Sequence, residues 1–115
     1  MRVVHDPEGA ARPLATDVET ADTFRRRLVG LMGRTTVPPD YALVFPFERA
    51  GVRGVHTVFV RTPVDVLWLR AGTVTQVETL PAWRGYGAAT ADTVVELRAG
   101  AAEGVAVGDT VVVEG

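Results

Sequence analysis

The sequence of 115 residues contains no cysteine, lysine, isoleucine, asparagine or serine. Without cysteine the chain cannot form a disulfide or a thiolate metal site. Because serine is missing as well, a histidine has neither of its usual nucleophiles to activate, and hydrolysis by a Ser-His-Asp or Cys-His arrangement is excluded. All 12 basic residues are arginines, and this bias, with the missing lysine, isoleucine and asparagine, is typical of a GC-rich genome.

Histidine is scarce and the net charge is small. His5 and His56 are the two histidines, whereas a closed zinc site needs about four ligands. The sequence also has no glycine-rich phosphate loop or dinucleotide fingerprint, so we expect neither a metal ion nor a cofactor. The net charge of −2 provides no overall field that would attract nucleic acid or an anionic membrane, and we expect neither as a partner.

Long apolar segments are also missing. No stretch approaches the roughly 18 uncharged residues of a membrane span, and the first residues reach Pro7 and charged side chains before any apolar run of signal-peptide length. We therefore expect a cytoplasmic protein. The length suits one domain, residues 1–115, that buries a core of its own.

Short apolar runs with a period of two predict β-strands along most of the chain. These runs cover residues 3–4, 13–18, 41–47, 55–61, 64–70, 73–80, 93–98 and 110–114. Ala71-Gly72 predicts a two-residue hairpin turn, whereas residues 48–54 and 81–91 have no clear period and are predicted to be loops. Since strands do not alternate with helices, we expect a mostly-β fold, either an antiparallel β-barrel or a jelly-roll-like sandwich.

One segment has a helical period instead. Phe24, Leu28, Leu31 and Met32 fall on one stripe of a helix that would run from Thr20 to Gly33. We therefore expect one α-helix, packed across an opening of the barrel or sandwich.

The pair Arg61 and Asp65 is the first candidate for a site. Four residues apart and separated by Pro63, they should lie on the same side of a strand. A carboxylate between two valines is costly to bury unless it is paired. Two interpretations stay open: a structural ion pair, or a polar pocket for an anionic or hydroxylated ligand.

Other arginines and two aromatic residues complete the predicted groove. Arg27 and Arg34 lie seven residues apart near the end of the predicted helix, and Trp83 and Tyr86 flank an arginine in a glycine-containing loop of the kind that stacks on sugars or bases. The predicted ligand-binding residues are Arg27, Arg34, Arg61, Asp65, Trp83 and Tyr86. This lining favours a non-enzymatic binding module for a carbohydrate or another polar small molecule.

Two alternatives to this function remain. Asp65 or Glu96 could act with His56 as acid and base, which would make the chain an enzyme. The arginine triplet 25–27 could instead dock on RNA or on a protein, in which case binding should weaken steeply with salt.

Several motifs together indicate a known family. They are Gly30-Leu31-Met32, Pro63-x-Asp65, Glu96-Leu97-x-x-Gly100 and Gly108-Asp109. From about residue 15 to residue 113 the chain resembles the domain-of-unknown-function family 192, as an archaeal-type member. Similar bacterial proteins commonly read Phe-Trp-Met-Lys-Asn-Thr before the proline, where this chain has Val-Phe-Val-Arg-Thr at 58–62. The resemblance implies a small β-rich domain without an agreed activity, and any shared site would centre on Arg27, Arg34, Arg61 and Asp65.

Overall fold

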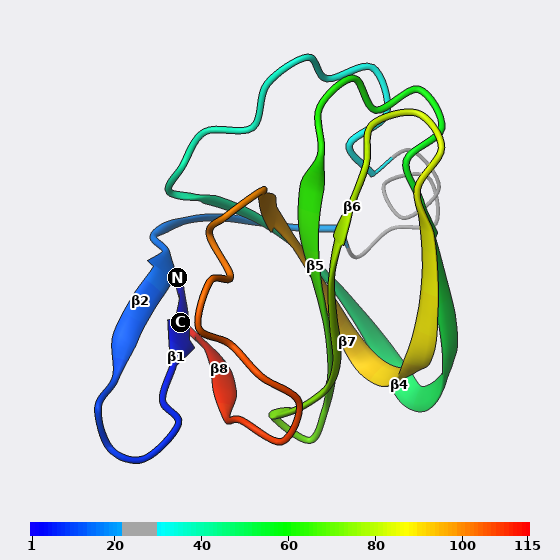
Figure 1. The fold of residues 1–115 in the computed structure, drawn as a ribbon. Helices are drawn as coiled ribbons and strands as arrows, with labels where there is room; N and C mark the ends of the chain where they lie inside the picture. The colour runs from blue at the N-terminus through cyan, green and yellow to red at the C-terminus, as the bar shows by residue number, and fades with distance from the viewer. Residues whose placement is uncertain (22–29) are drawn as a thin grey trace.

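The computed structural model describes residues 1–21 and 30–115, which form β-strands and connecting turns (Figure 1). The strands are β1 (Arg2–His5), β2 (Arg12–Ala15), β3 (Asp17–Thr20), β4 (Tyr41–His56), β5 (Val64–Arg70), β6 (Thr73–Leu80), β7 (Tyr86–Arg98) and β8 (Val111–Glu114). The prediction of a mostly-β fold is therefore confirmed.

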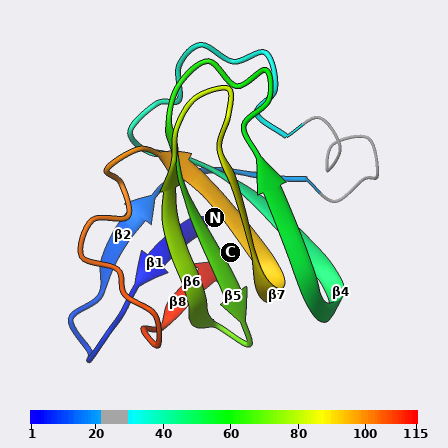
Figure 2. The ribbon, with the colours of Figure 1, turned by 45° about the vertical axis from the view of Figure 1, so that its right-hand side comes forward.

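The strands form two sheets. A three-stranded sheet has the order β2-β1-β8, and a five-stranded sheet has the order β3-β4-β7-β5-β6. The pairs are antiparallel apart from β3 and β4, which run parallel. Figures 1 and 2 show the small sheet lying against one side of the large one. Within the described residues the sheets stay separate, so the prediction of a barrel is wrong: the small sheet covers a face of the large sheet instead of extending its edge.

The predicted helix is not found in the described part of the chain. Most of it, including Arg27, falls on residues 22–29, outside the described residues. Residues 30–33, which were expected to complete the helix, form a turn instead. No helix in the described ranges has the length and apolar character needed to cross a membrane.

The central strands are buried on both faces, and their side chains alternate between two cores. The core between the sheets contains Val3, Leu14, Ala42, Val44, Leu67, Leu69, Val95, Leu97 and Val111. The core on the other face contains Leu31, Tyr41, Leu43, Phe45, Val60, Val64, Val66, Trp68 and Val94. Because successive residues of a strand point to opposite faces, neighbours such as Val95 and Glu96 face different cores.

A bend in the long β4–β7 hairpin gives the large sheet its shape. Ala42 to Pro46 pair with β7 from Leu97 to Thr93, and pairing resumes at Gly51, opposite Ala91. Residues 47–50 therefore face Asp92 alone, which is an extended bulge that bends both strands. This bend explains why residues 48–54 and 81–91 resemble loops although they contribute to β4 and β7.

The second half of this hairpin folds back over β5 and β6. The Trp68 indole N–H donates a hydrogen bond to the Arg53 carbonyl oxygen at 2.8 Å, and the Thr75 hydroxyl donates to the Thr90 carbonyl oxygen at 2.7 Å. β4 ends at His56, so the strand predicted for 55–61 is wrong over most of its length. The chain turns there because Thr57 is tied to the neighbouring loop.

The two predicted strands on either side of Ala71-Gly72 are found with the predicted bounds, as β5 and β6. Ala71 has φ 50° and Gly72 has φ 79°, the left-handed values that a two-residue hairpin turn requires.

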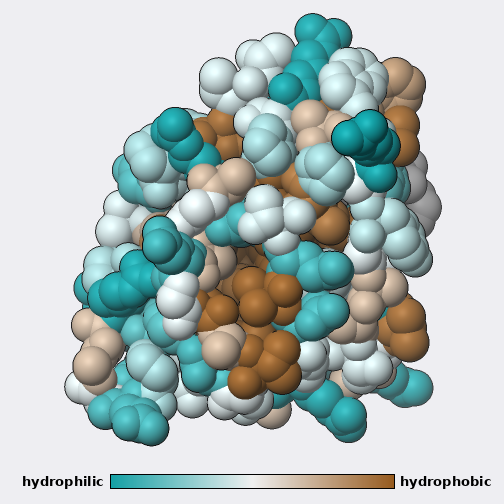
Figure 3. All heavy atoms as spheres, viewed as in Figure 1, coloured by the Kyte–Doolittle hydropathy of each residue, from teal (hydrophilic) through white to brown (hydrophobic). Residues whose placement is uncertain are grey.

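The space between the two sheets is partly open. A groove of about 350 Å³ is lined by Thr20, Val44, Pro46, Leu69, Gly72, Thr93, Val111, Val112 and Val113. Figure 3 shows apolar side chains gathered in the middle of this face, where β8 and β5 face each other in Figure 1.

Candidate functional site

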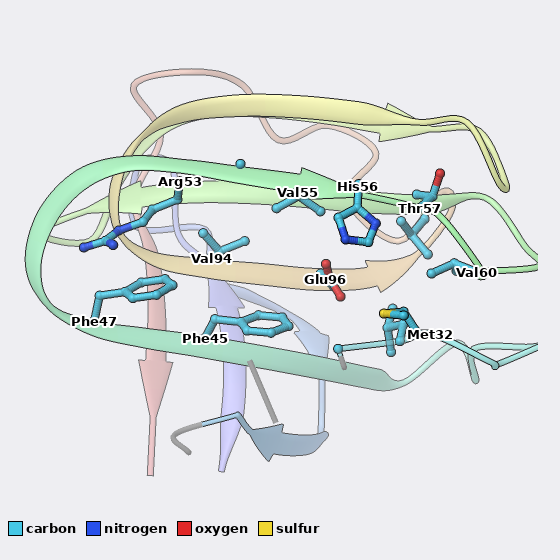
Figure 4. A pocket seen from close by; sticks show the side chains of 14 residues that line it. Met32, Phe45, Phe47, Arg53, Val55, His56, Thr57, Val60, Val94 and Glu96 are labelled. Carbon is cyan, nitrogen blue, oxygen red and sulfur yellow. The ribbon is translucent and has the colours of Figure 1, made fainter. Parts of the chain in front are cut away.

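The candidate site is a pocket inside the bend of β4, on the face of the large sheet that the small sheet leaves uncovered. Its volume is about 260 Å³. The lining residues are Gly30, Leu31, Met32, Phe45, Phe47, Arg53, Gly54, Val55, His56, Thr57, Val60, Val64, Val94 and Glu96. Figure 4 shows the two halves of β4 on opposite sides of the pocket, with β7 between them. Most of the lining is therefore apolar, and among the described residues Glu96 is its one acidic member.

Glu96 occupies a position where the sheet otherwise presents apolar side chains. On β7 it lies directly between Leu43 of β4 and Val66 of β5. Only 6% of the residue is exposed, and burial raises the pKa of its carboxyl group to about 8. Among the described residues, no ion pair or hydrogen bond is found for this carboxyl group. A buried acid without a partner is costly, and such groups are concentrated at functional sites.

The rim of the pocket carries His56 and Thr57. His56 Nδ1 accepts a hydrogen bond from the Val58 N–H at 3.2 Å, so the neutral ring carries its proton on Nε2. The Thr57 hydroxyl donates to the Pro81 carbonyl oxygen and accepts from the Gly85 N–H, both at 2.6 Å. Thr57 is fully buried and fastens the rim to the neighbouring loop.

Arg53 lines the other end of the pocket, and its guanidinium group is already engaged. It lies 3.9 Å from the centre of the Phe47 ring. Its Nη2 donates to the Arg49 carbonyl oxygen at 2.7 Å, and its Nε donates to the Ala91 carbonyl oxygen at 3.4 Å. Arg53 therefore reinforces the bend of β4.

Asp65, central to the site predicted from the sequence, lies on the opposite face of the sheet from Glu96. It is buried, and it accepts hydrogen bonds from the Thr79 hydroxyl at 2.7 Å and from the N–H groups of Gly100 and Ala102 at 2.9 Å each. The predicted ion pair with Arg61 is wrong, because these neutral donors satisfy the carboxylate. Asp65 holds the turn after β7 against β5 and β6.

Arg34 also has a different partner from the one expected. Its guanidinium group donates to the Tyr41 hydroxyl at 3.2 Å and lies 3.5 Å from the Glu19 carboxylate. The Tyr41 hydroxyl in turn donates to Glu19 at 2.9 Å. Burial, followed by the hydrogen bond to Glu19, raises the pKa of Tyr41 to about 12. These contacts connect β3 to the start of β4, away from Asp65.

Trp83 contacts an arginine outside the pocket, but this residue is Arg61 and not Arg84, the arginine between the two aromatic residues of the predicted platform. The Arg61 guanidinium group lies 5.9 Å from the Trp83 ring centre, and the rings of Trp83 and Phe59 meet edge to face at 5.9 Å. Phe59 and Trp83 have φ values of 63° and 68°, which are uncommon for bulky residues. Tyr86 begins β7 and is 69% exposed. Of the predicted residues, the structure thus brings Arg61 and Trp83 together, and the Arg61 backbone N–H donates a hydrogen bond to the Arg34 carbonyl oxygen at 3.0 Å.

The sequence contained one signal for the pocket. Glu96 interrupts the apolar run 94–97, where alternation alone would expect a core residue. Of the candidate acid and base residues Asp65, Glu96 and His56, Glu96 and His56 both line this pocket. Phe45, Phe47 and Arg53 were missed, because their convergence depends on the bend. Within residues 1–21 and 30–115, no three His, Asp or Glu side chains gather in a way that could hold a metal ion.

Comparison with known proteins identifies the family that the sequence motifs indicated. Residues 4–113 match the sequence model of DUF192, described as uncharacterized ACR. A UPF0127 protein of Pyrococcus furiosus is 35% identical over 78 residues, covering 65% of each protein. A UPF0127 protein of Thermococcus gammatolerans is 36% identical over 70 residues, covering 60% of this chain and 46% of that protein. The similar stretch thus spans less than two thirds of these relatives.

Two crystal structures have a similar fold. A candidate transcription regulator from Sinorhizobium meliloti gives a TM-score of 0.84 at 26% identity, over 96% of this chain and 91% of that one. A protein of unknown function from Novosphingobium aromaticivorans also gives a TM-score of 0.84, at 19% identity, over 98% of this chain and 84% of the other. The second likeness concerns the fold alone.

Proposed function

We propose that this chain, which belongs to the DUF192 family, is a binding module that holds a small molecule inside the bend of β4. The description of the family names no activity, so the proposal is drawn from the pocket. The observation that carries the proposal is the carboxyl group of Glu96, buried in an apolar pocket without a partner among the described residues. Pockets that bind small molecules have this composition, with an apolar lining and a few polar groups that fix the orientation of the ligand.

The alternating pattern of the sheet supports this proposal. At the corresponding positions of β4 and β5, Leu43 and Val66 fill the core with apolar side chains. An apolar residue at position 96 would bury more favourably, so folding alone does not account for the acid. Binding of a ligand does account for it, since functional sites are where proteins retain such costly residues.

The test is an NMR titration of the isotopically labelled chain with a panel of small amines, alcohols, carboxylates and sugars. We expect amide shifts to cluster around Met32, His56 and Glu96. In the variant Met32→Trp the larger ring should occupy the mouth of the pocket and weaken binding at least tenfold. Val52→Trp is the matched control, because Val52 is exposed and does not line the pocket. If no member of the panel shifts the pocket residues, the proposal fails.

A carbohydrate remains one of the proposed ligand classes. It is supported by the exposed Trp83 and Arg61, since a flat aromatic ring beside an arginine suits a sugar face. Shifts confined to Trp83 and Arg61 on addition of sugars would assign the sugar to this platform, whereas shifts at Glu96 would assign it to the pocket.

An acid–base enzyme is the second candidate function. The specific observation in its favour is that Glu96, whose pKa is raised to about 8, shares the pocket with His56. A carboxylic acid that keeps its proton near neutral pH is suited to general acid catalysis. Any ligand that binds in the pocket should then be examined for conversion to product, which Glu96→Gln should abolish while leaving binding measurable.

A further inference from the structure

The polar groups that line the pocket are mainly hydrogen-bond acceptors. Once ionised, Glu96 presents two acceptor oxygens, and Met32 presents a thioether sulfur, a weak acceptor. The face of the Phe45 ring carries partial negative charge. An acceptor-rich lining of this kind is complementary to a ligand that donates hydrogen bonds.

Some donors in the lining are already engaged. The Thr57 hydroxyl gives its proton to the Pro81 carbonyl oxygen. The Arg53 guanidinium group uses two of its five N–H groups on backbone carbonyl oxygens and stacks on Phe47. His56 can donate from Nε2, but it is an exposed residue at the rim. Within the described residues no cation pairs with the Glu96 carboxyl group, so a ligand that reaches this group meets an acid without a counter-charge.

We propose that the ligand is a small organic amine in its protonated form, whose ammonium group pairs with Glu96 while its apolar body contacts Phe45 and the surrounding side chains. This inference rests on the proposed function, since it names the chemical class that the same pocket accepts. The ammonium ion supplies the positive charge and the donors that the described residues do not provide to Glu96.

Gly30 lies beside both groups. A Cβ atom at this position would be 3.5 Å from Phe45 Cζ and 3.8 Å from Glu96 Oε1. Because Gly30 has no side chain, it adds no bulk between the pocket and these two groups. A volume of about 260 Å³ equals the space of about nine water molecules at roughly 30 Å³ each, which accommodates an amine with a single ring or a short alkyl chain.

The experiment compares three probes of similar size at pH 7 by calorimetry: benzylamine, benzyl alcohol and benzoate. Benzylamine should bind at least tenfold more tightly than the other two. Glu96 must ionise to pair with the ammonium group, and its pKa in the free protein is about 8. Binding at pH 7 should therefore release about one proton. Titrations in two buffers of different ionisation enthalpy detect this release. Affinity should increase up to about tenfold per pH unit below pH 8, level off above it, and decrease again once the pH is high enough to remove the proton from the amine.

Glu96→Gln removes the charge while keeping the shape of the side chain, and it should abolish both the preference for benzylamine and the proton release. Glu103→Gln is the matched control, because it removes the same charge from an exposed turn next to the opposite core and should leave both unchanged. An unchanged preference for benzylamine over benzyl alcohol in Glu96→Gln would overturn the inference.

The remaining outcomes separate the inference from the proposed function. If benzyl alcohol or benzoate binds in the pocket as tightly as benzylamine, the pocket binds small molecules but the assignment to amines is wrong. If neither these probes nor the larger panel bind there, the proposed function fails and the inference fails with it.

Discussion

At the scale of single residues, Glu96 makes the stability of the chain depend on pH. Its pKa is raised by burial from 4.5 to about 8, so between these values the folded state keeps a proton that the unfolded state has lost. The contribution of Glu96 to the free energy of unfolding should therefore be highest below pH 4.5, decrease as the pH rises through this window, and level off above pH 8. The shift corresponds to a decrease on the order of 5 kcal/mol.

Glu96→Gln should remove this dependence. We expect the variant to be about as stable as the parent chain at pH 4.5 and more stable at pH 8, by up to roughly 5 kcal/mol. Urea unfolding at a series of pH values measures the difference, with Glu103→Gln as the exposed control. An unchanged difference between variant and parent across the pH range would mean that Glu96 is not protonated in the folded state.

Asp65 should have the opposite effect on stability when it is replaced. Its carboxylate accepts three hydrogen bonds, including two from backbone N–H groups. In Asp65→Asn the amide NH₂ faces some of these donors, so we expect a loss of about 3 kcal/mol. Asp40→Asn, at an exposed position, should change stability by less than about 0.5 kcal/mol. Since Asp65 lies outside the pocket, ligand binding by the folded Asp65→Asn variant should be unchanged.

At the scale of elements, the turn between β5 and β6 contains two residues in the left-handed conformation, Ala71 and Gly72. Glycine adopts this conformation readily, whereas alanine does not. Ala71 adopts φ 50°, a left-handed conformation that Asn tolerates better than Ala. Ala71→Asn should stabilise the protein by about 1 kcal/mol. Gly72→Ala should destabilise it by about 1–2 kcal/mol. The nearest atom to the added Cβ is the Val111 carbonyl oxygen at 3.7 Å, so backbone strain and not a clash is the cause.

Thermal unfolding of the two variants checks this prediction. The midpoint should rise for Ala71→Asn and fall for Gly72→Ala. Changes of the same sign in both variants would contradict a turn with two left-handed residues.

Elements that depend on local pattern were predicted well from the sequence. β5 and β6 were predicted with their exact bounds, because each is an apolar, β-branched run that ends at a recognisable turn. The curled part of β4 and β7 was predicted as loop because residues 48–54 and 81–91 contain several glycines and have no period of two. Those residues are accommodated by a bulge that exists only through pairing with a distant strand, which spacing along the sequence does not reveal.

The same limit applies to the candidate site. Arg61 and Asp65 were grouped because they are close in sequence, but Asp65 is satisfied by Gly100 and Ala102 from another part of the chain. Glu96 and His56 were considered together because of their chemistry, and the folded hairpin brings both to one pocket. The chemical type of the side chains therefore predicted which residues share the pocket better than their closeness in the sequence did.

At the scale of the whole molecule, stability should decrease from the centre of the large sheet outward. β5 and β7 are paired on both sides and buried on both faces. β2 lies at an edge and contains Pro13. Amide hydrogen exchange should therefore be slowest in β5 and in residues 93–98 of β7, and at least tenfold faster in β2. Equal protection of β2 and β5 would contradict this order.

Because of the bulge at residues 47–50, the width of the pocket can change without a change in the strand pairing of the large sheet. The strand pairings on either side of it, from Ala42 to Pro46 and from Gly51 to His56, keep their own registers. Insertions or deletions in this short segment would change how far the two halves of β4 stand apart without disturbing either register. Length variation at this one turn therefore offers relatives with the same sheet a route to admit molecules of different bulk.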